Sequence, residues 1–185
     1  MKKIIIFQIL SLCLLIVGCS YPLYDEGDFF YLVVDDAKLP IWVMGDTNAD
    51  VFVVHLHGGP GGSAMKLAAT GKHDPLEEVA AVVYWDQRDS TNAQGITDLA
   101  TVTPEQFAED LDNVIDAISM RYNQPSIFLW GHSWGGGLGT LYLSDIEHQA
   151  KICGWIEMDG AHNMVDGMQY SREFVLDYAE SQIQN

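Results

Sequence analysis

The amino-acid sequence predicts an α/β fold in which a mostly parallel sheet carries helices on both faces. Apolar runs of strand length alternate with segments of helical periodicity, and this order is typical of parallel strands joined by crossover helices. The runs at 51–56 and 81–86 are apolar on both faces, as expected for strands in the middle of such a sheet. With 185 residues, the chain is long enough for one sizeable core.

The sheet is expected to begin with an antiparallel hairpin. The segment "FFYLVVDDAKLPIWVMGD", residues 29–46, alternates in polarity around a turn at Asp36 and Ala37. A third strand, Val51–Leu56, comes after "TNAD", and a glycine-rich loop comes directly after that strand. The hairpin therefore leads into the parallel part of the sheet.

Capping residues predict the helices of the next part of the chain. Asp74 is expected to be the N-cap of a short helix, with Pro75 next to it, and the strand at 81–86 comes after that helix. Thr103 and Pro104 open a longer helix, whose apolar face is formed by Phe107, Leu111, Val114, Ile115 and Ile118. Next are a strand at 126–130, a helix from about 136 to 147, a strand at 152–159 and a helix at 165–180.

The first 18 residues have the features of a secretory signal peptide. Two lysines precede an apolar run from Ile4 to Val17, and small residues end the segment. A permanent membrane helix is the weaker alternative, because a spanning helix needs about 20 apolar residues. The sequence "IVGC" resembles the lipobox of bacterial lipoproteins, which implies cleavage before Cys19 and a lipid on that cysteine. The resemblance places the protein in the cell envelope, anchored to a membrane, with the outer membrane or cell surface favoured.

These features divide the chain into four segments. We expect a lipoprotein signal peptide at 1–18, a tether at 19–28, a partial α/β core at 29–160 and the start of a helical lid at 161–185. After removal of Cys13 and acylation of Cys19, only Cys153 remains, so the mature chain is not expected to form an internal disulfide. The formal charge of -17 repels phosphate backbones and excludes nucleic acid as a partner.

A serine between two glycines is the strongest candidate for chemistry. Ser133 lies in "GHSWG", residues 131–135, between a predicted buried strand and a small-residue helix. In this context, a serine with a glycine two residues before it and another two residues after it predicts a sharp turn. Such a turn holds a nucleophilic serine in a disfavoured backbone conformation. A phosphate-binding loop is the alternative, and it is excluded because no lysine comes after the glycines.

The glycine-rich loop "HGGPGG", residues 57–62, is the second candidate element. Acyl transfer places negative charge on a carbonyl oxygen, and two preset N–H groups must stabilise it. We assign these donors to Trp134, which is next after the serine, and to Gly59, where the adjacent Pro60 stiffens the loop. The alternative is that the glycines form only a flexible connector.

Three motifs in order resemble the α/β-hydrolases of the prolyl aminopeptidase type. They are "HGGPGG", "YWDQRDS" and "GHSWGG", and the resemblance covers about residues 52–160. It implies an incomplete α/β-hydrolase fold and a serine hydrolase acting on small peptides, amides or esters, with Ser133 as nucleophile and Gly59 and Trp134 as oxyanion donors. It also implies a cis peptide bond between Gly59 and Pro60. The supporting motif residues are His57, Gly58, Pro60, Asp86, Gln87, Arg88, Gly131, His132 and Gly135.

The segment Asp86-Gln87-Arg88 matches the family's Asp-Gln-Arg, whose charged groups are expected to brace the loops around the site. A plain surface pair between Asp86 and Arg88 is the alternative. The family usually has glycine at the next position, where this chain has Asp89. The exact course of that loop is therefore left open.

The proton acceptor for Ser133 is the missing part of the predicted site. In this fold the acid and the histidine come after the serine, at the ends of later strands. Five of the six histidines precede the last predicted strand and are interpreted as structural, which leaves His162 as a possible base and Asp159 as a possible acid. We expect the base beyond Asn185 and this chain to be inactive or nearly so. The alternative is a non-catalytic, lipid-anchored binding protein; neither function requires a cofactor or metal.

Lipidation of Cys19 is testable directly. We expect the expressed chain to enter the detergent phase on phase partitioning, and Cys19→Ala to remain aqueous or keep an unprocessed leader of altered gel mobility. A Cys19→Ala protein that partitions into detergent with unchanged mobility would contradict the lipoprotein interpretation.

Overall fold

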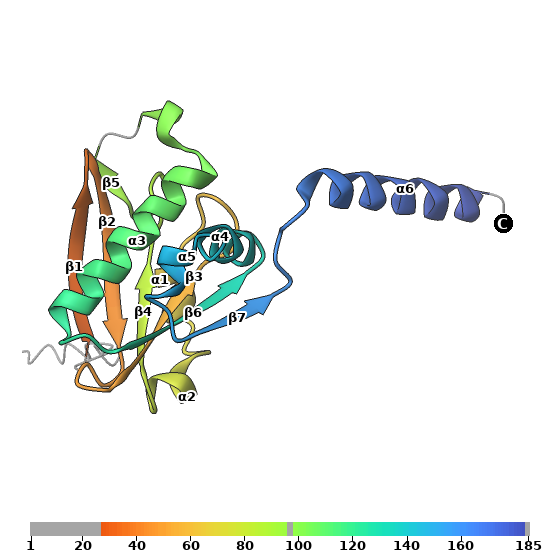
Figure 1. The fold of residues 1–185 in the computed structure, drawn as a ribbon. Coiled ribbons are helices and arrows are strands. Elements are labelled where there is room, and N and C mark those ends of the chain that lie inside the picture. Colours follow the sequence, from red (N-terminus) through yellow and green to blue (C-terminus); the bar gives the residue numbers. More distant parts are fainter. Residues whose placement is uncertain (1–26, 96–97, 184–185) are drawn as a thin grey trace, which may run out of the picture.

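The computed structural model describes residues 27–95 and 98–183 (Figure 1). The predicted signal peptide, the lipidation site at Cys19 and nearly all of the predicted tether lie outside the described residues. The two described ranges comprise the sheet, its covering helices and one further helix near the C-terminus.

The described residues form a seven-stranded mixed sheet, which confirms the predicted fold class. The strand order is β1-β2-β4-β3-β6-β7, with the short β5 paired to β2. Strands β4, β3, β6 and β7 are parallel, whereas β1, β2 and β5 pair in antiparallel fashion. The strands are β1 Gly27–Val34, β2 Ala37–Met44, β3 Val51–Leu56, β4 Ala81–Trp85, β5 Gln94–Gly95, β6 Ser126–His132 and β7 Gly154–Met158.

Helices cover both faces of the sheet (Figure 1). On one face, α3 and α4 pack on the main core, which contains Leu56, Leu129 and Leu138. On the other face, α1 contributes Ala64 and Ala68 to a smaller cluster with Val82 and Tyr84. The helices are α1 Ala64–Ala68, α2 Asp74–Glu77, α3 Pro104–Arg121, α4 Trp134–Tyr142, α5 Ile146–Gln149 and α6 Met164–Ile183, with a 3-10 turn at Leu99–Thr101.

The longest core helix forms as its sequence predicts. Thr103 is the N-cap of α3, and its side chain accepts a hydrogen bond from the N–H of Gln106. All five residues of the predicted apolar face are buried, and Asp110 is buried among them. An acidic residue on the apolar face of this helix requires a partner inside the protein.

Two local predictions differ from the structure, and one helix was not predicted. The helix expected at about 136–147 begins at Trp134 and is broken after Tyr142, because Asp145 caps a separate α5 by accepting from the N–H of Glu147. Asp74 lies inside α2, whose N-cap is His73. Helix α1 was not predicted, since it has only five residues and comes after a glycine-rich loop.

Helix α6 projects away from the sheet and its covering helices (Figure 1). None of its described side chains is buried, and large apolar residues such as Phe174 are exposed to solvent. It lies within the segment predicted to begin a lid, and that role stays a prediction. Across residues 27–95 and 98–183, every helix is too short or too polar to cross a bilayer.

His55, buried near the C-terminal end of β3, links the stability of this fold to pH. Burial, together with the nearby imidazoles of His73, His57 and His132, lowers its pKa to about 3. The unfolded chain takes up a proton near the ordinary pKa of 6.5, whereas the folded chain does not. The contribution of His55 to the free energy of unfolding is therefore fully present above about pH 6.5 and is lost progressively between about pH 6.5 and 3.

We expect the free energy of unfolding of the wild type to fall between about pH 6.5 and 5 by about 2 kcal/mol more than that of His55→Leu. The substitution is suitable because Nδ1 of His55 has no hydrogen-bond partner among the described residues. Urea denaturation at several pH values measures the difference between the two slopes. Equal slopes would show that His55 is not the group responsible.

Candidate active site

The turn at Ser133 has the strained geometry that the sequence predicts. Ser133 joins β6 directly to α4 and has φ 56° and ψ -120°, a backbone conformation that residues other than glycine rarely adopt. Its backbone N–H donates to the carbonyl of Met158 at 3.0 Å, and its own carbonyl accepts from the N–H of Ala161 at 2.9 Å. The hydrogen bonds to the β7 strand and to the segment after it hold the turn in place.

The two glycines of the motif are required by close packing. A Cβ atom at Gly135 would collide with the carbonyl of Leu56 at the end of β3. A Cβ atom at Gly131 would collide with the carbonyl of Gly135 and lie 2.6 Å from the ring of Trp155. The turn can therefore approach β3 only because Gly135 lacks a side chain, and Gly131 permits the close packing of the turn on itself and on Trp155.

The loop after β3 lies against this turn. A Cβ atom at Gly58 would lie 3.2 Å from Cβ of Ser133 and 3.1 Å from Nδ1 of His132, so this glycine permits the close approach. A Cβ atom at Gly59 would meet nothing within 4 Å, which leaves Gly59 on the open side of the loop. The approach of a substrate to the main chain is thus unobstructed at Gly59.

The expected cis peptide bond between Gly59 and Pro60 is wrong, because the described residues contain no cis peptide. The loop turns instead through positive φ values at Gly59 (68°) and Gly61 (78°). The N–H of Gly62 donates to the carbonyl of Gly59 at 2.9 Å and closes this turn. The convergence of the Gly59 and Trp134 N–H groups on one point stays a prediction.

Asp86 organises the start of α1 beside the glycine loop. Its buried carboxylate accepts from the hydroxyl of Ser63 at 2.9 Å, the N–H of Ala64 at 2.7 Å and the side chain of Asn92 at 2.7 Å. Carboxylates are favoured at a helix N-terminus, where backbone N–H groups are otherwise unpaired. Asp86 thereby connects the loop after β4 to the end of the loop after β3.

Arg88 forms a buried ion pair with α3 and does not pair with Asp86. Its Nε and Nη2 atoms each lie 2.6 Å from a carboxylate oxygen of Asp110, and Nη1 donates to Thr101 at 3.0 Å. The hydrogen bonds with Asp110 raise the pKa of the guanidinium. Both side chains are almost fully buried, so removing one partner leaves an unpaired buried charge at a cost of about 3–5 kcal/mol.

Asp89 adopts the conformation that glycine would have at this position. Its φ is 59°, in the left-handed region that glycine favours and aspartate tolerates. The departure from the family pattern is accommodated by Asp89 itself, which is exposed, while its neighbours Arg88 and Ser90 remain buried. The course of this loop, left open by the sequence, is thereby fixed.

His57 is a buried, neutral side chain between the loops. Its Nε2 lies 3.3 Å from the backbone N–H of Gln87 and must accept that hydrogen bond. Its Nδ1 therefore carries the proton and donates to the carbonyl of Gly58 at 3.3 Å. Burial lowers the pKa of His57, and since its only lone pair is engaged, His57 does not accept a proton from Ser133.

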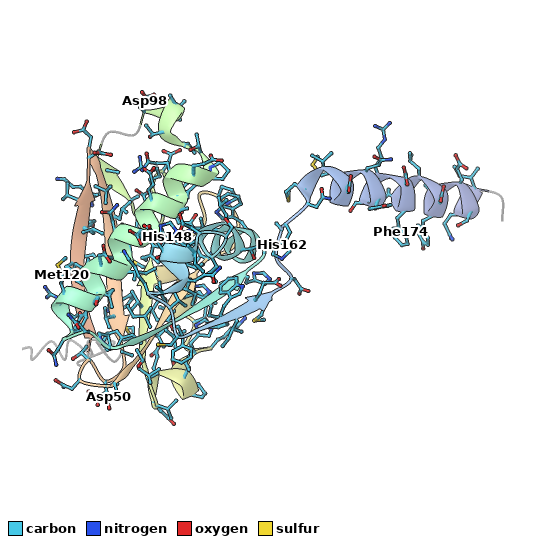
Figure 2. All side chains as sticks on the ribbon, viewed as in Figure 1. Asp50, Asp98, Met120, His148, His162 and Phe174 are labelled. Carbon is cyan, nitrogen blue, oxygen red and sulfur yellow. The ribbon has the colours of Figure 1, made fainter. Side chains whose placement is uncertain are left out.

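Within the described residues, no side chain is placed to accept the proton of the Ser133 hydroxyl. Neither an imidazole nor a carboxylate of residues 27–95 and 98–183 accepts a hydrogen bond from its hydroxyl. His162 lies on the connection between β7 and α6 (Figure 2), exposed to solvent, with Nε2 3.5 Å from the carboxylate of Glu157. Asp159, at the end of β7, is also exposed. Neither side chain forms a hydrogen bond with the serine hydroxyl within the described residues.

An open, mainly apolar pocket of about 360 Å³ lies next to the turn. Pro104 at the start of α3 and Trp134 and Leu138 of α4 form part of its wall, and Ala161 and His162 close another side. It is large enough for an amino-acid side chain or a small ring. The described residues thus combine a strained serine, a glycine loop and an adjoining apolar pocket.

The individual partners of the Asp86-Gln87-Arg88 side chains were not predicted from the sequence, and two of these contacts are instructive. One is the partner of Arg88, although an aspartate on the apolar face of α3 is a signal that could have identified Asp110. The other is the hydrogen bond from the Trp134 indole to Gln87, at 2.9 Å. Nothing in the spacing of those two residues, which are 47 positions apart, indicates that they meet.

Comparison with known proteins identifies a matching family. The family described as "Serine aminopeptidase, S33" matches residues 49–175. A probable aminopeptidase of Bacillus subtilis is 27% identical over 114 residues, which are 60% of this chain and 35% of that protein. A proline iminopeptidase of Chitinophaga pinensis is 28% identical over 104 residues, which are 56% of this chain and 34% of that protein. The chain spans about a third of the length of these two relatives.

Solved structures share the same architecture. The proline iminopeptidase-related protein of Thermus thermophilus is 28% identical, with a TM-score of 0.55 over 66% of this chain and 42% of that one. A putative aryl esterase of Burkholderia cenocepacia has a TM-score of 0.60 at 20% identity, over 72% of this chain and 47% of that one. The second likeness concerns the fold alone.

The backbone strain at Ser133 can be measured through its effect on the free energy of unfolding. We expect the free energy of unfolding of the Ser133→Gly variant to be about 1–2 kcal/mol higher than that of the Ser133→Ala variant, because glycine relieves the strain and alanine retains it. Chemical denaturation of both variants gives the difference. If the alanine variant is as stable as the glycine variant, the backbone at this position is not strained.

Proposed function

Because the chain belongs to the serine aminopeptidase (S33) family and is an α/β-hydrolase of the prolyl aminopeptidase type, we propose that it hydrolyses peptide, amide or ester bonds through an acyl-enzyme on Ser133. The observation that carries this proposal is the strained turn of Ser133 against the glycine loop. Strain of this kind costs about 1–3 kcal/mol and is typical of functional sites.

The proposed reaction has two steps. Oγ of Ser133 attacks the substrate carbonyl carbon while a base takes the hydroxyl proton, and the oxyanion receives hydrogen bonds from the N–H groups of Trp134 and Gly59. The N–H of Trp134 is suited to this role, because a residue in the first turn of a helix has no acceptor within that helix. The scissile bond then breaks, and the leaving nitrogen or oxygen takes the proton from the base. Water releases the acyl group by the same route.

The base is proposed to be an imidazole that does not belong to this 185-residue chain. The hydroxyl of Ser133 has no acceptor within the described residues, and an alkyl hydroxyl without a base is a poor nucleophile at neutral pH. Loss of the histidine of such a site has cost about a million-fold in turnover. On this proposal the chain alone is inactive or nearly so.

The adjoining pocket supports a substrate with a small apolar group next to the scissile carbonyl. The walls contributed by Pro104, Trp134 and Leu138 offer little hydrogen bonding. As part of the same proposal, Cys19 carries a lipid that holds the enzyme at a membrane of the cell envelope.

A non-catalytic binding protein is the second candidate function. The observation that favours it is again the absence of an acceptor for the Ser133 hydroxyl among the described residues. Such a protein would bind a peptide or ester across the same turn and pocket without cleaving it.

Added imidazole separates the two candidates. We expect a fluorophosphonate probe to label the chain scarcely at all, and high concentrations of imidazole to raise labelling at Ser133 by about tenfold, since free imidazole recovers only part of the about 10²–10⁴ that a positioned base contributes. Labelling is located by peptide mass spectrometry, with Ser133→Ala as the control.

Three outcomes decide the question. Imidazole-dependent labelling at Ser133 supports the hydrolase with a missing base. Efficient labelling without imidazole contradicts the missing base. No labelling at Ser133 under either condition contradicts the hydrolase and leaves the binding protein as the better function.

A further inference from the structure

Gln87 lies fully buried between the two loops that would stabilise the oxyanion. Its side-chain Oε1 accepts from the indole N–H of Trp134 at 2.9 Å, and its Nε2 donates to the carbonyl of His57 at 3.5 Å. Its backbone N–H donates to Nε2 of His57 at 3.3 Å. One residue thus makes three hydrogen bonds to two segments that are far apart in the sequence.

The partners fix the orientation of the carboxamide. An indole N–H can only donate, so the atom facing Trp134 must be the amide oxygen. A backbone carbonyl can only accept, so the atom facing His57 must be the amide nitrogen. A side chain at this position therefore needs an acceptor and a donor at opposite sides of one planar group.

Among the described residues, backbone packing and the Gln87 side chain connect the two loops. The backbone of the turn packs against the end of β3, where Gly135 meets Leu56, and Gly58 lies close to Ser133. Because these glycines have no side chains, they do not fix the distance between the two loops. The Trp134 ring is also fixed on another side by the ring of Phe107 on α3, with centroids 5.7 Å apart. Gln87 links that ring to the glycine loop through hydrogen bonds to the Trp134 indole and to His57.

We propose that Gln87 is a positioning residue that sets the spacing between the Trp134 turn and the His57–Gly62 loop, and hence between the two oxyanion donors. The proposal rests on the proposed function for its effect on rate, whereas the spacing itself can be measured without catalysis. Donors preset at the right distance account for much of oxyanion stabilisation, and loss of one donor has cost about 10²–10³ in turnover.

Variants of Gln87 and Trp134 separate the contributions of the individual hydrogen bonds. Gln87→Glu keeps an acceptor for the Trp134 indole but places a carboxylate oxygen against the carbonyl of His57. Gln87→Met keeps the length of the side chain and loses both bonds. Trp134→Phe removes the indole donor and leaves the bond to His57. Gln94→Met, on the exposed β5 strand, is the matched control.

The first readout is nuclear magnetic resonance of the full chain. We expect the indole N–H resonance of Trp134 to move upfield in Gln87→Met and to remain downfield in Gln87→Glu, because only the second variant keeps an acceptor. The amide hydrogen of Gly62, which donates to the carbonyl of Gly59, is expected to exchange at least about tenfold faster in both Gln87 variants than in Gln94→Met, because local opening becomes easier without the link. Unchanged resonance and exchange in Gln87→Met would overturn the proposal, whether or not Ser133 reacts.

The second readout is imidazole-assisted labelling of Ser133. We expect the maximal labelling rate to fall by about tenfold or more in Gln87→Met, Gln87→Glu and Trp134→Phe, with little change in the probe concentration that gives half of that rate. A purely structural role would instead lower thermal stability and leave the maximal rate of the folded protein unchanged, which would overturn the positioning role. Circular dichroism identifies any variant that fails to fold, and Gln87→Glu then replaces Gln87→Met.

If the wild type does not react with the probe under any condition, the proposed function fails while the first readout still decides the role of Gln87. A shifted indole resonance and faster exchange would then support Gln87 as the link between the loops. A reactive wild type with an equally reactive Gln87→Met would sustain the hydrolase and overturn the role of Gln87.

Discussion

The contact between Gly135 and the carbonyl of Leu56 is the constraint on which the rest of the site depends. Strands β3 and β6 are parallel neighbours, and the glycine loop and the Ser133 turn begin where these strands end. A turn with a side chain at Gly135 could not pack against β3. Because the turn sits so close, its serine is brought beside Gly58 rather than into solvent. Backbone packing without side chains therefore positions the candidate nucleophile, at the cost of local strain.

Side chains of the loop after β4 support this glycine contact from outside. Asp86 binds the start of α1, Arg88 pairs with Asp110 on α3, and Gln87 reaches the Trp134 indole. Three consecutive residues thus connect to three different parts of the fold. Each of the three side chains is almost fully buried, so solvent competes little for these bonds.

The sequence predicted the features that depend on neighbours along the chain. The order of the long strands, the cap at Thr103 and the glycines around Ser133 all arise from local patterns, and the structure agrees with them. Prediction failed where a competing local conformation or a distant group decides the outcome. Asp145 divides a segment that reads as one helix, and positive φ values at Gly59 and Gly61 replace the expected cis peptide. The pairing of Gln87 with Trp134 arises only when β4 and β6 flank β3 in the folded sheet.

Helix α3 supports two parts of the site at once. Its first residue, Pro104, forms a wall of the apolar pocket, and Asp110, nearly two turns further on, holds the loop that contains Gln87. The pocket wall and the loop therefore share one mechanical support. Thermal softening of that helix would displace the pocket wall and loosen the loop together, so the shape of the pocket and the geometry of the loop would change over the same range of temperature.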